Sequence, residues 1–266
     1  MFNKILLLNP ILQALIAGLF TYSITALGAA LVFFMKKINK TFMDGMLGFS
    51  AGIMIAASFF SLILPAINMA EELKLIPWLI VLIGFISGGL LLFIGDKIYD
   101  IIELKLKKTK TKSLKRCTML MMSITLHNIP EGMAVGVAFG SVIYGITGAG
   151  LISAWVIALG IGLQNFPEGT AVSMPLRREG FSRKKAFFYG QLSGLVEPIS
   201  AFLGALLVMK IRILLPLLLS FAAGAMIYVV IEELIPESQT NKKKDLMAIF
   251  TILGFSLMMV LDLTLG

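Results

Sequence analysis

The chain has 266 residues, of which 58% are hydrophobic and only 14% are charged, and its formal net charge is +8. Soluble domains carry about 45–50% apolar and about 25% charged residues. The composition therefore excludes a soluble globular enzyme, a disordered chain and a disulfide scaffold, and it predicts an integral membrane protein. In such a protein an excess of Lys and Arg is typical of cytoplasmic loops, so no nucleic-acid partner is expected.

Apolar runs of membrane length follow one another along the chain. A transmembrane helix needs about 20 mostly apolar residues, and eight such runs are present: 9–35, 44–68, 75–95, 117–141, 147–175, 186–209, 213–233 and 246–265. The longest charged segment between them is a Lys/Thr-rich loop at about 96–116. The sequence predicts an all-α integral membrane protein, an eight-transmembrane-helix bundle that forms a single domain over residues 1–266.

The basic residues test this topology because they divide unevenly between the two sets of loops. If the spans alternate in direction, 19 of the 23 Lys and Arg residues fall in four loops: 36–44, 96–116, 176–185 and 236–245. The positive-inside rule makes these loops cytoplasmic, which places both termini outside the cytoplasm. We expect a multi-pass protein of the cell (plasma) membrane, with the lipid bilayer as its surroundings.

Three acidic residues lie deep inside the predicted spans. They are Glu131, Glu168 and Glu197, whereas Glu232 and Glu233 lie near the predicted cytoplasmic end of the seventh span. Ionisable groups inside a membrane are costly and tend to mark ion pathways. These glutamates are therefore candidate functional residues.

Two of the buried glutamates share a local sequence. HNIPEGMAV begins at His127, the only histidine, QNFPEGTAV begins at Gln164, and six of the nine positions match. Because consecutive spans run antiparallel, this is a short inverted repeat that would bring both motifs together near the bilayer midplane. Residues four apart share a helix face, so His127 lies beside Glu131 and Gln164 beside Glu168.

The motif prolines add backbone oxygens to this set. Pro130 and Pro167 have no N–H, so each frees the carbonyl four residues earlier, at Leu126 and Leu163. A single Pro-containing helix with a protonated glutamate would be a packing feature. Two matched motifs with an imidazole, carboxylates and amides instead favour a divalent cation, and imidazole with carboxylate suits zinc and other first-row ions.

These features resemble the ZIP (Zrt/Irt-like) family of divalent metal transporters. The resemblance rests on the two motifs, on the eight spans and on the segments 194–198 (GLVEP) and 232–238 (EELIPES), and Gln at position 164 is similar to the GufA-like branch. It implies a binuclear metal site. One metal position would use His127, Glu131, Gln164 and Glu168, and the second would use Asn128, Asn165 and Glu197, with Glu131 and Glu168 bridging.

The resemblance also implies a function, namely alternating-access transport of zinc or a similar divalent cation (Fe²⁺, Mn²⁺ or Cd²⁺) into the cytoplasm. The metal is then the substrate, and no cofactor is expected. Spans one, four, five and six would slide as a unit, and Glu232 would contribute to a carboxylate-based exit. Two alternatives stay open: an intramembrane metalloenzyme, against which the lack of an HExxH pattern counts, and a proton-coupled metal exporter.

Two further patterns have both a functional and a structural interpretation. Met54, Ser61 and Asn68 share one face of the second span, where the resemblance places the outer pathway, although small residues that allow close packing explain that face equally well. Glycines recur every four residues from Gly132 to Gly140. They predict close helix contacts inside the bundle, with a homodimer interface as the alternative.

Overall fold

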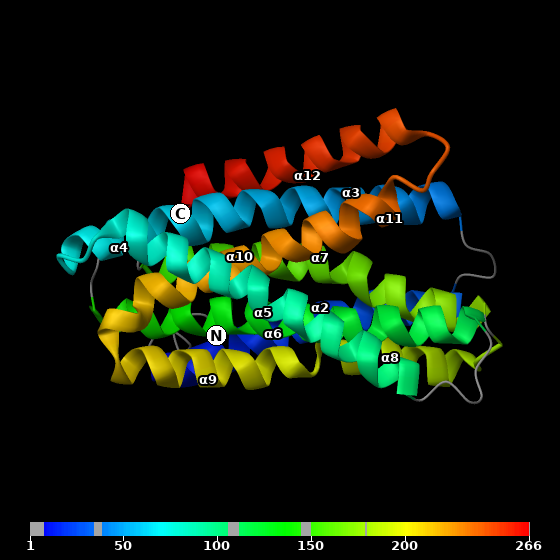
Figure 1. Ribbon diagram of the computed structural model, residues 1–266, viewed down its shortest axis with the longest axis horizontal. Coiled ribbons are helices and arrows are strands. Elements are labelled where there is room, and N and C mark those ends of the chain that lie inside the picture. The colour runs from blue at the N-terminus through cyan, green and yellow to red at the C-terminus, as the bar shows by residue number, and fades with distance from the viewer. Residues whose placement is uncertain (1–7, 35–38, 106–111, 145–149, 179, 266) are drawn as a thin grey trace.

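The computed structural model describes residues 8–34, 39–105, 112–144, 150–178 and 180–265, and for some of these, including His127, it describes the backbone alone. Throughout these ranges the regular structure is helical, and most of the helices lie along one long axis (Figure 1). The elements are α2 (Pro10–Phe34), α3 (Lys40–Ala57), η1 (Ser58–Ile63), α4 (Leu64–Glu72), α5 (Pro77–Lys105), α6 (Lys112–Ser141), η2 (Val142–Tyr144), α7 (Leu151–Arg178), α8 (Arg183–Gly194), α9 (Val196–Lys210), η3 (Arg212–Leu214), α10 (Leu215–Val229), η4 (Val230–Leu234), α11 (Ile235–Ser238) and α12 (Lys244–Leu265).

Within the described residues, six helical segments are long and apolar enough to cross a membrane. They are Pro10–Phe34, Lys40–Glu72, Pro77–Ile98, Arg183–Lys210, Leu215–Ser238 and Lys244–Thr264. The remaining two predicted spans correspond to α6 and α7, which have 30 and 28 residues. Both carry a polar motif with one Asn and one Glu, joined by His127 in α6 and by Gln164 in α7, and these residues lower the mean hydropathy. The fold is therefore that of an all-helical membrane protein, as the composition predicts.

The region predicted as a loop at about 96–116 is more helical than expected. α5 continues to Lys105 and α6 already begins at Lys112, which leaves 106–111 between them, outside the described residues. Apolar runs mark the part of a helix that lies in the hydrocarbon, not its whole length. Lys and Leu are good helix formers, so both helices extend beyond the apolar run.

Two spans contain a wide helical turn that the sequence analysis did not predict. In the second span η1 precedes Pro65, and in the seventh span η4 precedes Pro236. A proline ring clashes with the carbonyl four residues earlier, at Ser61 and Glu232 respectively, and both of these residues lie inside the wide turns. A π-type turn moves that carbonyl away without breaking the helix.

The sixth predicted span is divided at Leu195, between α8 and α9. Pro198 has no N–H to offer the carbonyl of Gly194, so the last turn of α8 loses this hydrogen bond. By contrast, α6 and α7 run without a break through Pro130 and Pro167. The motif helices therefore stay continuous, whereas the sixth span is interrupted two residues before Glu197.

Four pairs of helices make the closest contacts: α2 with α7, α6 with α9, α3 with α12, and α5 with α10. Glycines at these interfaces face the main chain of the partner helix: Gly28 faces Phe166, Gly136 faces Ala201, Gly52 faces Thr251 and Gly88 faces Phe221. Small residues let membrane helices approach closely. The predicted internal contacts of the glycines from Gly132 to Gly140 are confirmed, because all of them face α9.

Two adjacent glycines of α5 give a matched test of this packing. A Cβ on Gly88 would lie 2.8 Å from the carbonyl carbon of Phe221, whereas a Cβ on Gly89 would lie 3.5 Å from its nearest neighbour, the Gly224 oxygen. We expect Gly88→Ala to destabilise the bundle by about 1–3 kcal/mol, the usual cost of overpacking. Gly89→Ala should leave the thermal unfolding midpoint of the purified protein nearly unchanged. Equal midpoints for both variants would contradict this packing.

The helix pairs form two groups. The motif group contains α2, α6, α7, α8 and α9, and the flanking group contains α3–η1–α4, α5, α10–η4–α11 and α12. Contacts between the groups run chiefly from α3 to α7 and from α10 to α6. A hydrogen bond of 3.0 Å also joins the groups, from Ser50 Oγ of α3 to the Gln164 carbonyl of α7.

The helix ends that flank the four basic loops lie at one end of the long axis, on the right in Figure 1. Two of these ends are tied together directly. Asn241, between α11 and α12, donates to Asp44 Oδ2 of α3 over 2.8 Å, and Ser238 Oγ donates to the Asp44 carbonyl over 2.8 Å. The helix ends that border the basic loops therefore lie together at one end of the bundle.

Candidate metal site

The two motifs meet at the interface of α6 and α7. The side chains of Asn128, Glu131, Gln164, Asn165 and Glu168 are all fully buried. Gln164 Nε2 donates a hydrogen bond of 2.5 Å to Glu131 Oε1. The centres of the two motifs are therefore in direct contact in the interior of the bundle.

Glu197 joins this cluster from the first turn of α9. Its side chain is fully buried, and its Oε2 accepts a hydrogen bond of 2.7 Å from Asn165 Nδ2. Close by, Asn128 Nδ2 donates over 3.0 Å to the carbonyl of Ser193, which lies in the last turn of α8. Carbonyls of a last turn have no partner within their helix. The break in the sixth span thus supplies the Ser193 carbonyl as an acceptor for Asn128, and it is followed at once by Glu197, which accepts from Asn165.

The electrostatics of the cluster are unfavourable without a compensating charge. Glu131 is close enough to Glu168 and Glu197 for their charges to repel one another. Burying several carboxylates together is costly unless they take up protons or a cation lies among them. The fold nevertheless buries all three on helices that contact each other, which favours a binding role over a packing role.

Four oxygen atoms of the two motifs have no hydrogen-bond donor within the described part of the chain. They are Asn128 Oδ1, Glu131 Oε2, Gln164 Oε1 and Asn165 Oδ1, and all four are buried. Buried polar atoms are nearly always paired, so an exception calls for an explanation. Because all four are acceptors, the partner that they lack is a positively polarised one. A divalent cation fits this donor set.

The described carboxylates alone do not form a complete set of metal ligands. Among the side chains that the structure describes, no three His, Cys, Asp or Glu residues lie close enough together to hold a metal ion. The buried amides of Asn128, Gln164 and Asn165 lie among the carboxylates and offer further oxygen atoms. His127 belongs to α6, one turn before Glu131, and its side chain lies outside the description.

The weaker candidates from the sequence lie apart from this cluster. Met54 is fully buried in α3, whereas Asn68 is exposed near the end of α4. Ser61 donates a hydrogen bond of 2.6 Å to Asp262 of α12. In η4, Glu232 is exposed and Glu233 is half-buried.

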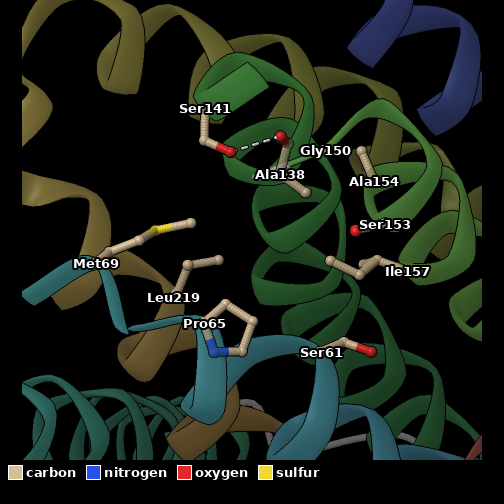
Figure 2. A pocket seen from close by; sticks show the side chains of 10 residues that line it. All are labelled: Ser61, Pro65, Met69, Ala138, Ser141, Gly150, Ser153, Ala154, Ile157 and Leu219. Carbon is tan, nitrogen blue, oxygen red and sulfur yellow. Dashed lines mark hydrogen bonds between the residues drawn. The ribbon is translucent and has the colours of Figure 1, made fainter. Parts of the chain in front are cut away.

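Ser61 also lines a small cleft at the end of the bundle where α6 finishes and α7 begins (Figure 2). Ala138 of α6 and Ile157 of α7 line the same cleft. Each lies seven residues from a cluster residue, Glu131 or Gln164, on the same helix face and about 10 Å away along the axis. The cleft therefore lies about two helical turns from the cluster, toward the end of the bundle where α6 finishes.

Three contacts of the cluster escaped the sequence analysis: the hydroxyl of Thr25 on α2, the carbonyl of Ser193 and the hydroxyl of Ser50. Thr25 Oγ1 donates to Glu197 Oε1 over 3.0 Å. The signal in the sequence was weak, because Ser and Thr are ordinary residues of membrane helices and only three-dimensional packing shows which of them reach a carboxylate.

A helical membrane protein with a buried cluster of carboxylates and amides between a continuous helix pair and an interrupted helix has the architecture of a secondary transporter. The family described as ZIP Zinc transporter matches residues 105–262. The chain belongs to this family, whose members are transporters and not enzymes, so the metalloenzyme alternative is set aside.

Curated relatives agree over nearly the whole chain. It is similar to the zinc transporter ZIP11 of Bos taurus, with 37% identity over 97% of this chain and 98% of the relative. It is also similar to the zinc transporter ZIPB of Bordetella bronchiseptica, with 36% identity over 95% of this chain and 81% of the relative. The zinc transporter GufA of Myxococcus xanthus is 35% identical over 95% of this chain and 98% of the relative.

Proposed function

We propose that this chain carries Zn²⁺, or a similar divalent cation, across the membrane through the cluster between α6 and α7. The observation that supports this most strongly is the set of four buried motif oxygens that lack a donor. The relatives named above as zinc transporters support the choice of substrate. The mixture of oxygen ligands with one imidazole also suits Fe²⁺, Mn²⁺ and Cd²⁺.

The proposed site has two metal positions that share ligands. His127, Glu131, Gln164 and Glu168 form the first, and Asn128, Asn165 and Glu197 form the second, with Glu131 and Glu168 between the two. The hydrogen bond from Gln164 to Glu131 and the one from Asn165 to Glu197 support this grouping. When a cation binds, the amides of Gln164 and Asn165 would turn their oxygens toward the metal, and their N–H groups would leave the carboxylates of Glu131 and Glu197.

The proposed pathway runs along the second span, on the side that carries Ser50 and Met54 of α3 and Ser61 of η1. Ser50 contacts the Gln164 main chain beside the cluster, and Ser61 lines the cleft. Met54 lies between them along the chain and is fully buried. At the other end, Glu232 and Glu233 offer carboxylates where the cation leaves.

Transport by alternating access requires one part of the bundle to move against the other. The motif group contains every proposed ligand, and it contacts the flanking group chiefly through α3–α7 and α10–α6. We propose that the motif group slides and carries the site with it, which breaks the Ser50–Gln164 hydrogen bond. The pathway lies within one bundle, so it does not require a homodimer.

The proposed topology follows the charge. With eight spans in the plasma membrane and the basic helix ends of Figure 1 on the cytoplasmic side, both termini lie outside. If the first three spans correspond to the last three, and the fourth span to the fifth, then the pairing α2–α7 corresponds to α9–α6 and the pairing α5–α10 corresponds to α12–α3. The π-type turns η1 and η4 also correspond, and both precede a proline. This correspondence supports an inverted repeat that is centred between the fourth and fifth spans.

Proteoliposomes that contain a fluorescent zinc sensor test the proposal. Vesicles that contain the purified protein should take up external Zn²⁺, and added Fe²⁺, Mn²⁺ and Cd²⁺ should slow this uptake in proportion to their affinity for the site. Zinc flux measured under imposed gradients of each sign distinguishes import from proton-coupled export. No zinc flux in either direction would contradict the proposal.

We expect Gln164→His to shift the selectivity of uptake toward zinc over iron and manganese. An imidazole nitrogen replaces an amide oxygen, and nitrogen ligands favour zinc relative to the harder manganese ion. The change is measured as the ratio of inhibition constants in the same competition assay. An unchanged ratio would remove Gln164 from the direct ligands of the metal.

A further inference from the structure

Thr25 reaches Glu197 from α2, a helix that carries neither motif. Both side chains are fully buried, and Thr25 Oγ1 donates to Glu197 Oε1 over 3.0 Å. Thr21, one turn earlier on the same helix face, interacts with the same carboxylate. Glu197 is therefore held by hydroxyls on one side and by the Asn165 amide on the other.

The position of Thr25 is fixed by close packing on both sides. A Cβ on Gly194 would lie 2.9 Å from Thr25 Cγ2 and 2.8 Å from Glu197 Oε1. A Cβ on Gly169 of α7 would lie 2.9 Å from the carbonyl carbon of Thr25. Because both neighbours are glycines, the backbones of α7 and α8 approach α2 closely and set Thr25 beside the carboxylate. The same hydroxyl also lies 3.3 Å from the carbonyl of Thr21, its other acceptor.

The two oxygens of Glu197 differ in their ability to take up a cation. Asn165 Oδ1 lacks a donor, so this amide can turn, release Glu197 Oε2 and present its own oxygen to the same cation. Thr25 lies on a helix that carries no proposed metal ligand, and its hydroxyl donates to Oε1. The carboxylate thus offers Oε2 to the cation while Oε1 stays anchored.

We infer that Thr25 is a positioning residue for the second metal position, where it holds Glu197 so that Oε2 faces the cation. This inference rests on the proposed function, because it presumes that Glu197 binds metal. Carboxylates that bind metals are themselves hydrogen-bonded, and losing that outer partner typically costs 10–100-fold in metal affinity. Thr25 moves with the motif group, so it supports Glu197 throughout the proposed transport cycle.

Equilibrium binding of Zn²⁺ to the purified full chain tests the inference. Thr25→Val keeps the shape of the side chain and should weaken the binding step that depends on Glu197 by about 10–100-fold. Thr25→Ser should restore the affinity. The matched control is Thr251→Val on α12, whose hydroxyl donates to the Met247 carbonyl within its own helix; this variant should bind like the parent. If Thr25→Val does not fold, Thr25→Ala serves in its place.

Glu197→Gln separates the inference from the proposed function. If Glu197→Gln binds zinc as tightly as the parent at every step, Glu197 is not a ligand and the second metal position fails. If Glu197→Gln weakens binding but Thr25→Val does not, the role of Thr25 is overturned. The effect of Thr25→Val should vanish in the Glu197→Gln background, and an undiminished effect there would also overturn it.

Discussion

Replacing Glu131 or His127 with alanine is expected to lower zinc uptake into proteoliposomes by more than about 100-fold. Loss of a partner that merely supports a metal ligand costs 10–100-fold, and both of these residues are proposed as ligands. Glu131 would also bridge the two metal positions, and its Oε2 is one of the buried oxygens without a donor. Its removal therefore affects both positions at once.

Two controls keep this result interpretable. The thermal unfolding midpoint and the elution profile of each variant report whether the bundle still folds. Asp245→Asn removes an exposed carboxylate from the first turn of α12, far along the chain from the cluster, and should transport like the parent. Full zinc uptake by folded Glu131→Ala and His127→Ala variants would show that the cation does not pass through this cluster.

A membrane potential that is negative inside is expected to drive zinc accumulation against its own gradient. Moving one elementary charge across 100 mV is worth about 2.3 kcal/mol, so a divalent cation gains about 4.6 kcal/mol. At about 1.4 kcal/mol for each factor of ten, uniport reaches an inside-to-outside ratio of about 2,000 at equilibrium. The sensor-loaded vesicles measure this ratio after a potassium diffusion potential is imposed.

A pH gradient of either sign is the control for ion coupling. Metal ligation releases protons from ligands that were protonated in the empty site, but in uniport those protons return from the same side, and the final ratio follows the potential alone. An exchanger that moves two protons for each cation would be electroneutral. A final ratio that follows the pH gradient and ignores the potential would contradict uniport and favour the proton-coupled exporter.

Much of the fold was predictable because membrane insertion leaves strong marks in a sequence. Apolar runs and the distribution of Lys and Arg locate the spans, and the repeated motif indicates which helices meet. The contact between Gln164 and Glu131 agrees with that repeat, which predicts that the two motifs meet. The helix ends were less predictable: α5 reaches Lys105, since charged residues end an apolar run without ending a helix.

The details around the prolines were not predictable from pattern alone. Pro130 and Pro167 leave their helices continuous, Pro65 and Pro236 follow π-type turns, and Pro198 follows a break. The local rule is the same at each position, since each proline frees one carbonyl. The outcome depends on what the neighbouring helices offer to that turn, which is a property of tertiary packing.

The hydrogen-bonded surroundings of the site were also missed. The repeated motif and the buried glutamates indicated the acids and amides of the site, because these residue types are rare in apolar spans. Thr25 is an ordinary helix residue until the packing of α2 against α7 and α8 sets its hydroxyl beside Glu197. Residues that position a ligand are therefore harder to predict from one sequence than the ligands themselves.

Anomalous diffraction from crystals grown with Cd²⁺ would locate the cation most directly. We predict an anomalous peak between α6 and α7, within bonding distance of Glu131 Oε2 and Gln164 Oε1, that disappears in crystals of Glu131→Ala. A second peak beside Asn165 and Glu197 would mark the second metal position. Cadmium peaks elsewhere in the bundle, with none between the two motifs, would contradict a metal site in this cluster.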